Sequence, residues 1–467
     1  MKILQFNQDA TCCVVSPSDD MINIYNCDPF GKCFEFNAKN NNKNGMEQTN
    51  GENDSNNMRL GGIEEEEDDE VQNTLEQIAR NNNDNNDDSG FIVEMLFSTS
   101  LVAICDRNQG PIKSKRLKIV NTKRKSIICE LVFPHEVVDV AMNRKRMCIL
   151  LENEQIFIYD ISCMKPLETI DLWDNPRNNL PDGTGNSGEH DKAHLQRNEY
   201  SRKRRNSLTS RIRPRIALSN DDRSILCYTS FSMSNNNPGS YLIKDIVVYD
   251  ALNVKPINYI NNVHKGNIAC LAVNKDGKMM ATASEKGTIV RIFSTGIDME
   301  FDSSKQLQYE FRRGTRPANI YQLVFSKDST LVGCVADTDT IHIFSLVQNN
   351  PETEQILAEN STNAVNPGEE NAEASTSSLQ SGLKNSTERP KQFASFLSKK
   401  IRASISSQGI SRDFAHIKMN EKSKYRMGFP DEYPNEVYIV GNDGTFSIYS
   451  IPSKTGECVL SKSSSFV

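Results

Sequence analysis

A short strand pattern that returns seven times is the feature that most constrains the fold of this 467-residue chain. In each copy, β-branched or other apolar residues alternate with polar ones and lead to an aromatic residue or a valine. Such period-two alternation is typical of a half-buried β-strand. The copies are MINIYN from Met21, RLKIVN from Arg116, QIFIYD from Gln155, DIVVYD from Asp245, TIVRIF from Thr288, TIHIFS from Thr340 and TFSIYS from Thr445.

Several copies follow a second apolar run that is opened by a turn. These runs are NDDRSILCYTS, NKDGKMMATAS and SKDSTLVGCVA. Asp-Gly and Asp-Ser turns between short apolar runs favour antiparallel hairpins. The repeated unit is therefore expected to be a small antiparallel sheet, and the chain to be all-β.

The spacing of the copies predicts the architecture. Successive copies start 95, 39, 90, 43, 52 and 105 residues apart, and each long interval contains a segment without strand pattern, namely 38–88, 174–212 and 348–412. Without these segments every unit measures about 40–50 residues, the length of a four-stranded propeller blade. The sequence predicts one seven-bladed β-propeller over 1–467, WD-repeat-like, with three long and mostly disordered loop insertions.

The first two insertions differ in charge. Segment 38–88 is Asn-rich and carries the acidic run Glu64–Glu70, so it is expected to be disordered, and the run is most simply a solvated tail. Segment 174–212 ends in SRKRRNSLTSR, which places Ser207 two residues after Arg205. Basophilic kinases accept this pattern, but it also arises by chance.

The third insertion contains a basic amphipathic segment, 391–405, directly after Pro390. Its apolar residues share one helical face and have Lys399, Lys400 and Arg402 beside them. The segment is too short to hold a helix alone, but it is expected to fold on an anionic membrane and insert shallowly. The alternative is that its aromatic pair packs on the propeller. The residues expected to insert are Phe393, Phe396, Leu397 and Ile401, followed by Ile405.

Composition excludes several classes of protein. Hydrophobic residues make up only 37%, and no apolar run approaches the 18 residues of a membrane-spanning helix. The N-terminus does not resemble a signal peptide. A net charge of −7 argues against a general nucleic-acid binder. The 12 cysteines are scattered without a CxxC pair, which favours reduced thiols over disulfides or zinc.

Enzyme motifs are also missing. The chain has no Gly-x-Ser-x-Gly, no phosphate-binding P-loop, no nucleotide fingerprint and no metal-spaced set of His or Cys. We therefore expect no catalytic residue, no metal and no cofactor.

Two adjacent arginines, Arg312 and Arg313 in the sequence FRRG, are the most informative polar residues. Neighbouring residues of a strand point to opposite sides, so the two arginines serve two different surroundings, both expected to be solvent-facing pockets. Arginine with hydroxyl and His donors suits phosphate. The alternatives are surface ion pairs for the arginines and a structural role for His264. Nearby donors are His264, Ser284, Thr288 and Arg291 before the motif, and Thr338, Thr340 and His342 after it.

FRRG between TASEKGTIVRIF and DTDTIHIF resembles the PROPPINs, the β-propellers that bind polyphosphoinositides. The resemblance extends from LQFNQDATCCVV to GTFSIYSIPSKTGECVL. It implies seven blades and one pocket on each side of the motif for phosphatidylinositol 3-phosphate, often also the 3,5-bisphosphate. It places Arg312 with His264, Ser284, Thr288 and Arg291, and Arg313 with Thr340 and His342. Many relatives have Ser where this chain has Ala336, and Thr338 is a substitute donor.

The resemblance also implies a role. A family member would act in autophagy and cytoplasm-to-vacuole transport, where it would localise the lipidation of a ubiquitin-like autophagy protein onto phosphatidylethanolamine. It would be a cytoplasmic, peripheral membrane protein of the vacuole, endosomes and phagophore assembly site. The alternative is a WD-repeat-like scaffold that binds only proteins, because fold does not determine function.

Two basic turns are candidates for a protein partner. Arg144, Lys145 and Arg146 lie between two strands, and Lys123 and Arg124 form a similar turn earlier in the chain. Such turns lie at the rim of a propeller and are suited to an acidic helix, such as a coiled-coil component of the lipid-conjugation machinery. Alternatively, they only keep the rim soluble.

Overall fold

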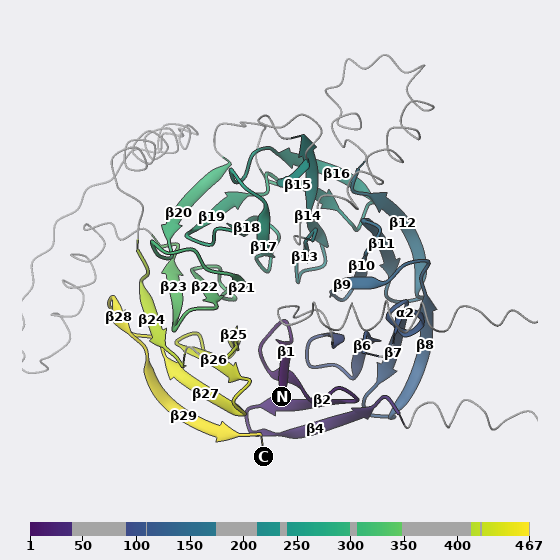
Figure 1. Cartoon of the computed structure of the whole chain (residues 1–467), viewed down its shortest axis with the longest axis horizontal. Coiled ribbons are helices and arrows are strands. Elements are labelled where there is room, and N and C mark those ends of the chain that lie inside the picture. Colours follow the sequence, from purple (N-terminus) through teal and green to yellow (C-terminus); the bar gives the residue numbers. More distant parts are fainter. Residues whose placement is uncertain are drawn as a thin grey trace, which may run out of the picture.

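Seven antiparallel sheets stand around a common axis in the computed structural model of the chain (Figure 1). The structure describes residues 1–39, 90–108, 110–173, 213–233, 241–298, 306–347, 412–420 and 423–466. Each sheet is one blade, and its first strand lies nearest the axis (Figure 1). The prediction of a seven-bladed, all-β propeller is confirmed.

The first four blades each take four consecutive strands. Blade 1 comprises β1 (Lys2–Phe6), β2 (Cys12–Ser18), β3 (Met21–Cys27) and β4 (Phe30–Asn37). Blade 2 comprises β5 (Phe91–Met95), β6 (Leu101–Asp106), β7 (Arg116–Asn121) and β8 (Ser126–Val132), with the short helix α2 (Pro111–Ser114) between β6 and β7. Blade 3 comprises β9 (Val137–Met142), β10 (Arg146–Leu151), β11 (Gln155–Asp160) and β12 (Lys165–Asp171). Blade 4 comprises β13 (Ile216–Leu218), β14 (Ile225–Met233), β15 (Tyr241–Asp250) and β16 (Lys255–Ile260).

The last three blades carry the arginine pair and the chain terminus. Blade 5 comprises β17 (Ile268–Val273), β18 (Met279–Ser284), β19 (Ile289–Ser294) and β20 (Leu307–Arg312). Blade 6 comprises β21 (Ile320–Phe325), β22 (Leu331–Ala336), β23 (Thr340–Ser345) and β24 (Ala415–Lys418), to which β28 (Gly456–Glu457) adds in parallel. Blade 7 comprises β25 (Tyr425–Gly428), β26 (Glu436–Gly441), β27 (Thr445–Ser450) and β29 (Val459–Ser465).

All seven copies of the sequence pattern are the third strand of a blade, from β3 to β27. The three turn-opened runs contain the second strands β14, β18 and β22. The three predicted insertions fall almost wholly outside the described residues. Glu64–Glu70, Ser207 and segment 391–405, with Phe393, Phe396, Leu397 and Ile401, therefore lie there too.

The ring closes between blade 7 and blade 1 through aromatic side chains. Phe30 stacks on Phe446 with ring centroids 4.8 Å apart, and Tyr25 meets Phe466 edge-on at 4.7 Å. The Tyr25 hydroxyl donates to the carbonyl of Phe466 at 3.2 Å. The first and last blades share no strand, so side-chain packing of this kind helps to join the two ends of the ring.

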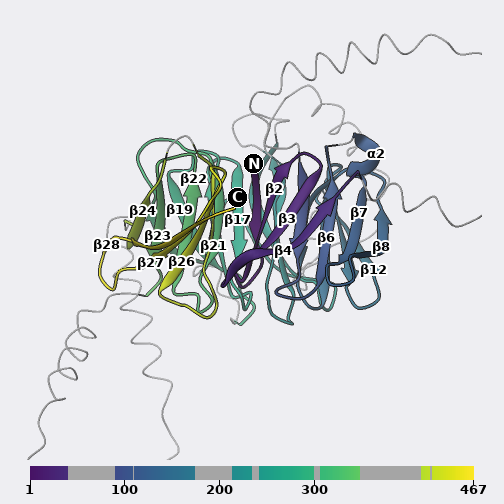
Figure 2. The same cartoon turned by 90° about the horizontal axis from the view of Figure 1, so that it is seen from below.

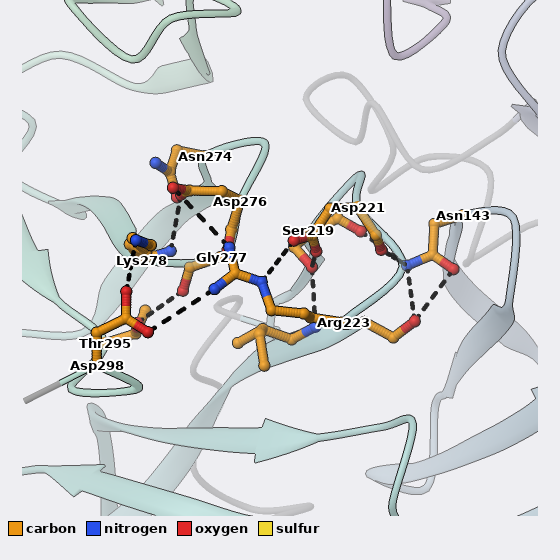
Figure 3. Close-up of polar contacts among 12 residues, drawn as sticks. Asn143, Ser219, Asp221, Arg223, Asn274, Asp276, Gly277, Lys278, Thr295 and Asp298 are labelled. Carbon is orange, nitrogen blue, oxygen red and sulfur yellow. Dashed lines mark hydrogen bonds and ion pairs between the residues drawn. The ribbon is translucent and has the colours of Figure 1, made fainter.

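The turns between first and second strands join neighbouring blades through polar contacts (Figure 3). Asn143 accepts from the backbone of its own turn and donates through Nδ2 to the carbonyl of Ser219 in blade 4, at 2.8 Å. Arg223 of blade 4 pairs with Asp221 at 2.6 Å and reaches Asp276 and Asp298 of blade 5 at 3.9 Å each. One end of the ring is therefore held by contacts that link blades 3, 4 and 5.

Apolar clusters fill the spaces between blades. Met280 and Phe293 of blade 5 pack with blade 4, whereas Val290 and Phe311 of blade 5 pack with blade 6. Blade 5 therefore has one face toward each neighbour, and alternate residues of its strands belong to different faces.

Candidate functional site

The arginine pair lies where β20 ends. Arg312 is the last residue of β20 and is paired with Ile289, two positions from the pair Glu310 and Arg291. Directly paired residues share a face of the sheet, so Arg312 lies on the face toward blade 4. Phe311, beside it, belongs to the cluster toward blade 6. Arg312 and Arg313 thus lie on different sides of blade 5.

Arg312 and Arg313 differ in exposure. Arg312 is exposed. Arg313 is only 7% exposed, and its Nε donates to the carbonyl of Gly287 at 2.7 Å, while a terminal nitrogen donates to the carbonyl of Arg316. The expectation that both side chains face solvent is therefore wrong for Arg313. The two carbonyls fix its guanidinium against the turn that leads into β19.

The first cluster, which comprises His264, Thr282, Ser284, Thr288, Arg291 and Arg312, lies mainly on the blade 4 side of blade 5. Arg291 pairs through Nε with Glu310 at 2.7 Å and donates to the carbonyl of Val263 at 2.7 Å. The next residue, His264, is buried, and its Nε2 lies 3.0 Å from the Thr282 hydroxyl. The Thr282 hydroxyl donates in turn to the carbonyl of Arg291 at 3.4 Å, so these bonds connect His264, Thr282, Arg291 and Glu310 in one chain.

The imidazole of His264 is neutral at physiological pH. Burial, assisted by the charge of Arg291, lowers the pKa of His264 to about 4. A neutral imidazole contributes a directed donor or acceptor but no charge. The positive charge of the first cluster therefore comes from its two arginines.

A glycine turn connects Ser284 to Thr288. Gly287 has φ +62° and donates its N–H to the carbonyl of Ser284 at 2.8 Å. The carbonyl of Thr288 accepts the backbone N–H of Arg313 at 3.0 Å. A Cβ at position 287 would overlap the carbonyl oxygen of Ala318 in the next blade. Only glycine fits here, and the carbonyls of Gly287 and Thr288 in this turn position Arg313.

The second cluster lies between blades 5 and 6 and comprises Arg313, Thr338, Thr340 and His342. Nδ1 of His342 lies 2.9 Å from Oδ2 of Asp413, and Nδ1 of His416 lies 3.7 Å from the same oxygen. Burial lowers the pKa of His342, and the Asp413 carboxylate opposes that shift. The hydroxyl of Thr340 donates to Asp339 at 3.0 Å, and that of Thr338 to the carbonyl of Thr340 at 3.3 Å.

Strand pairing makes the two clusters equivalent, position by position. Arg291 is paired with Thr282 and Glu310, and His342 is paired with Cys334 and His416. Two residues earlier in β19 and β23, Ile289 is paired with Arg312 and Thr340 is paired with Lys418. Lys418 in blade 6 thus occupies the position of Arg312 in blade 5, and the buried Ala336 that of Ser284.

Sequence reasoning missed Thr282, Glu310, Asp413, His416 and Lys418. The last three follow the interruption 348–411, so nothing in their sequence shows which residues of β23 they face. Glu310 is two residues from Arg312 in one strand, and period-two alternation alone was a sufficient signal for it.

The two basic turns lie at the same end of the blades, because turns after first and third strands emerge on one side. Arg144 and Lys145 are exposed, and the Arg144 guanidinium lies 3.9 Å from the centre of the Phe97 ring. Lys123 and Arg124 are exposed on the turn from β7 to β8.

Arg146 does not belong to this basic surface. It is 8% exposed, and it donates to the carbonyls of Ala251 at 2.8 Å and Leu252 at 2.9 Å and pairs with Asp160 at 3.1 Å. The expectation that Arg146 binds a partner is therefore wrong, because its guanidinium is buried and joins blade 3 to blade 4. Separately, no helix within the described residues is long and apolar enough to span a membrane.

Comparison with known proteins assigns the chain to a family. The PROPPIN sequence model matches residues 70–195 and 218–394. The chain is a PROPPIN. It is 52% identical to autophagy-related protein 21 of Saccharomyces cerevisiae and 48% identical to that of Vanderwaltozyma polyspora, over the whole of each chain. This establishes the family that the FRRG resemblance indicated.

Solved structures agree with the fold. KlAtg21, in a complex with the coiled-coil of AgAtg16, is 38% identical and covers 100% of this PROPPIN and 99% of its own chain at a TM-score of 0.64. Hsv2 of Kluyveromyces lactis, 15% identical, covers 100% of this chain and 99% of its own at 0.56. The second similarity supports the propeller fold alone.

Proposed function

We propose that this PROPPIN binds phosphatidylinositol 3-phosphate, and also the 3,5-bisphosphate, through the two clusters. The observation that carries the proposal is the position of Arg312 and Arg313 on different sides of blade 5, each on the side where one cluster of hydroxyl and imidazole groups lies. Arginine makes paired, charge-assisted bonds to phosphate, and neutral donors complete such a site. Two headgroup sites on one rigid ring engage one membrane together, which raises avidity.

Segment 391–405 is proposed as a third attachment, with Phe393, Phe396, Leu397 and Ile401 inserting into the bilayer. This part of the proposal rests on the sequence pattern. The bound protein would be peripheral, on the vacuole, endosomes and the phagophore assembly site.

The proposed role on the membrane is to localise the autophagy lipid-conjugation machinery, including the ubiquitin-like autophagy protein, in autophagy and cytoplasm-to-vacuole transport. The exposed turns with Arg144, Lys145, Lys123 and Arg124 would bind the acidic surface of a coiled-coil component. Support comes from the 38% identical KlAtg21, solved with the coiled-coil of AgAtg16.

Vesicle co-sedimentation tests the lipid proposal. Arg312→Thr and Arg313→Thr should each weaken sedimentation with vesicles containing phosphatidylinositol 3-phosphate, and the double variant should lose it. Arg312→Lys should also bind poorly, because lysine cannot make the paired contact. Arg116→Thr, which removes an exposed arginine from blade 2, is the matched control.

The alternative, a scaffold that binds only proteins, makes the opposite prediction. A folded double variant that sediments like the parent would contradict the lipid proposal. Parent protein that ignores the vesicles but still captures the coiled-coil would support the scaffold instead.

A further inference from the structure

One turn of blade 2 holds a bulky residue in an unusual backbone conformation. Phe97 follows β5 and has φ +48°, in the left-handed region that a Cβ disfavours. A bulky residue persists there only where its surroundings hold it, and such positions cluster at functional sites. The other residues with positive φ in the described turns between first and second strands are all small, namely Ala10, Ser224, Gly277 and Ser329. Phe97 is therefore a candidate functional residue.

Gln8 of blade 1 holds the Phe97 turn in place. Its Oε1 accepts the backbone N–H of Phe97 at 2.6 Å. Its Nε2 donates to the carbonyl of Met95 in blade 2 at 2.6 Å and to that of Met142 in blade 3 at 3.0 Å. β1 begins at the upper end of the ring in Figure 2, where the N-terminus is marked, so the turn after it lies at the lower end. One side chain thus fixes the Phe97 turn relative to the end of β9, which the Arg144 turn follows.

The Phe97 ring lies beneath the Arg144 guanidinium, whose central carbon is 3.9 Å from the ring centre. Phe97 is only 7% exposed, whereas Arg144 is exposed. The Arg144 turn is also fixed from the side of blade 4. There Asn143 accepts from the backbone N–H of Lys145 at 2.9 Å and donates to the carbonyl of Ser219 at 2.8 Å (Figure 3). Both the backbone and the guanidinium of Arg144 are therefore held in place by contacts within the protein.

The N–H donors of Arg144 remain available to a partner. A contact with an aromatic ring uses the face of the guanidinium, whereas its five N–H donors lie in its plane. Among the residues that the structure describes, none accepts a hydrogen bond from this guanidinium or forms an ion pair with it. Arg146 differs, because the carbonyls of Ala251 and Leu252 take its donors. Arg144 thus presents an oriented pair of donors that suits one carboxylate.

We propose that Phe97 is a positioning residue for a protein partner: its ring holds the Arg144 guanidinium in the orientation that makes two parallel bonds to one carboxylate of an acidic helix. A side chain loses rotamer freedom on binding, and a guanidinium that is already stacked loses less. The exposed Lys145, Lys123 and Arg124 add charge around this point. The inference rests on the proposed function, because it concerns the same basic turns and the acidic coiled-coil proposed to bind them.

Titration calorimetry of the full chain with the coiled-coil of AgAtg16 tests this role, at low salt so that weakened variants stay measurable. Phe97→Leu, which keeps an apolar side chain but removes the ring, should weaken binding about three- to tenfold. Phe97→Tyr keeps a ring beneath the guanidinium and should bind within about twofold of the parent. Phe157→Leu makes the same change in β11, where the ring packs edge-on against Phe133, and is the matched control that should bind like the parent.

A thermodynamic cycle separates positioning from a purely structural role. In the Arg144→Gln background, Phe97→Leu should change the affinity by less than about twofold, because no guanidinium is left to orient. An equal loss in both backgrounds would overturn the inference, and so would a loss of vesicle co-sedimentation in Phe97→Leu. A parent that does not bind the coiled-coil would overturn the proposed partner and this inference with it, whereas a parent that binds but tolerates Phe97→Leu would overturn the inference alone.

Discussion

The two clusters beside β20 occupy equivalent positions of adjacent blades but use different chemistry. In the first, Arg291 and Arg312 supply permanent charge, which Glu310 partly balances. In the second, His342 stands at the position of Arg291 and Lys418 at that of Arg312. Arg313, which extends from blade 5, adds a guanidinium there. Strand pairing in the repeated fold thus keeps equivalent positions in equivalent places, whereas the charge at those positions differs from blade to blade.

The largest effect is expected at the glycine turn, because its carbonyls position Arg313 between the two clusters. Gly287→Ala should lower the free energy of unfolding by about 3 kcal/mol or more, since the left-handed backbone and the carbonyl of Ala318 leave no room for a Cβ. Chemical denaturation measures this. Gly314→Ala, where a Cβ meets nothing within 4 Å, is the control and should stay within about 0.5 kcal/mol. Equal stability of the two variants would refute this account of the turn.

The two arginines should differ in their effect on stability. Arg313→Gln leaves the carbonyls of Gly287 and Arg316 without their donor and should cost about 2 kcal/mol. Arg312→Gln, at an exposed position, should stay within about 0.5 kcal/mol. Urea unfolding of both variants, read by circular dichroism, makes the comparison. A destabilised Arg312 variant would show that its side chain also supports the fold.

Much of the fold was predictable from the sequence, because the third strand of each blade repeats one alternating pattern. The MINIYN and TFSIYS runs, more than 400 residues apart, were enough to place blades 1 and 7. The exposure of neighbouring arginines was not predictable in this way. Alternation shows that Arg312 and Arg313 face different sides, but only the packing of the Gly287 turn shows that one of them is buried.

Long-range pairing was the other limit. Lys418 faces Thr340 across a 64-residue interruption, and no local pattern encodes that register. The prediction for Arg146 was wrong for a similar reason, because the carbonyls that accept its hydrogen bonds, those of Ala251 and Leu252, belong to the next blade. A charged residue in a turn looks exposed in sequence even when carbonyls from elsewhere in the chain enclose it.

A variant of Lys418 tests whether the two clusters bind a headgroup in the same way. If the second cluster holds a headgroup, as we propose, Lys418→Gln should weaken vesicle co-sedimentation about three- to tenfold, because the equivalent of Arg312 is lost. The effect should be smaller than that of Arg312→Gln, since Glu457, 3.3 Å from Nζ of Lys418, already balances part of this charge. Lys255→Gln, on the outer strand of blade 4, is the control. Unaltered binding would show that the outer strand of blade 6 does not contact the headgroup.

The smallest expected difference lies in the pH dependence of stability. The pKa of His264 falls from 6.5 to about 4 on folding, so protons favour the unfolded chain. The stability that this residue contributes is present above pH 6.5 and is lost as the pH falls toward 4. Between pH 7 and pH 5.5 the loss should be about 1 kcal/mol, given about 1.4 kcal/mol for each pKa unit.

His264→Gln, compared with the parent by urea unfolding at both pH values, should remove that part of the pH dependence of stability. His342→Gln should change the slope less, because Asp413 stabilises the protonated imidazole and offsets part of the effect of burial. Equal changes in the two variants would mean that Asp413 does not stabilise the protonated form of His342 as proposed.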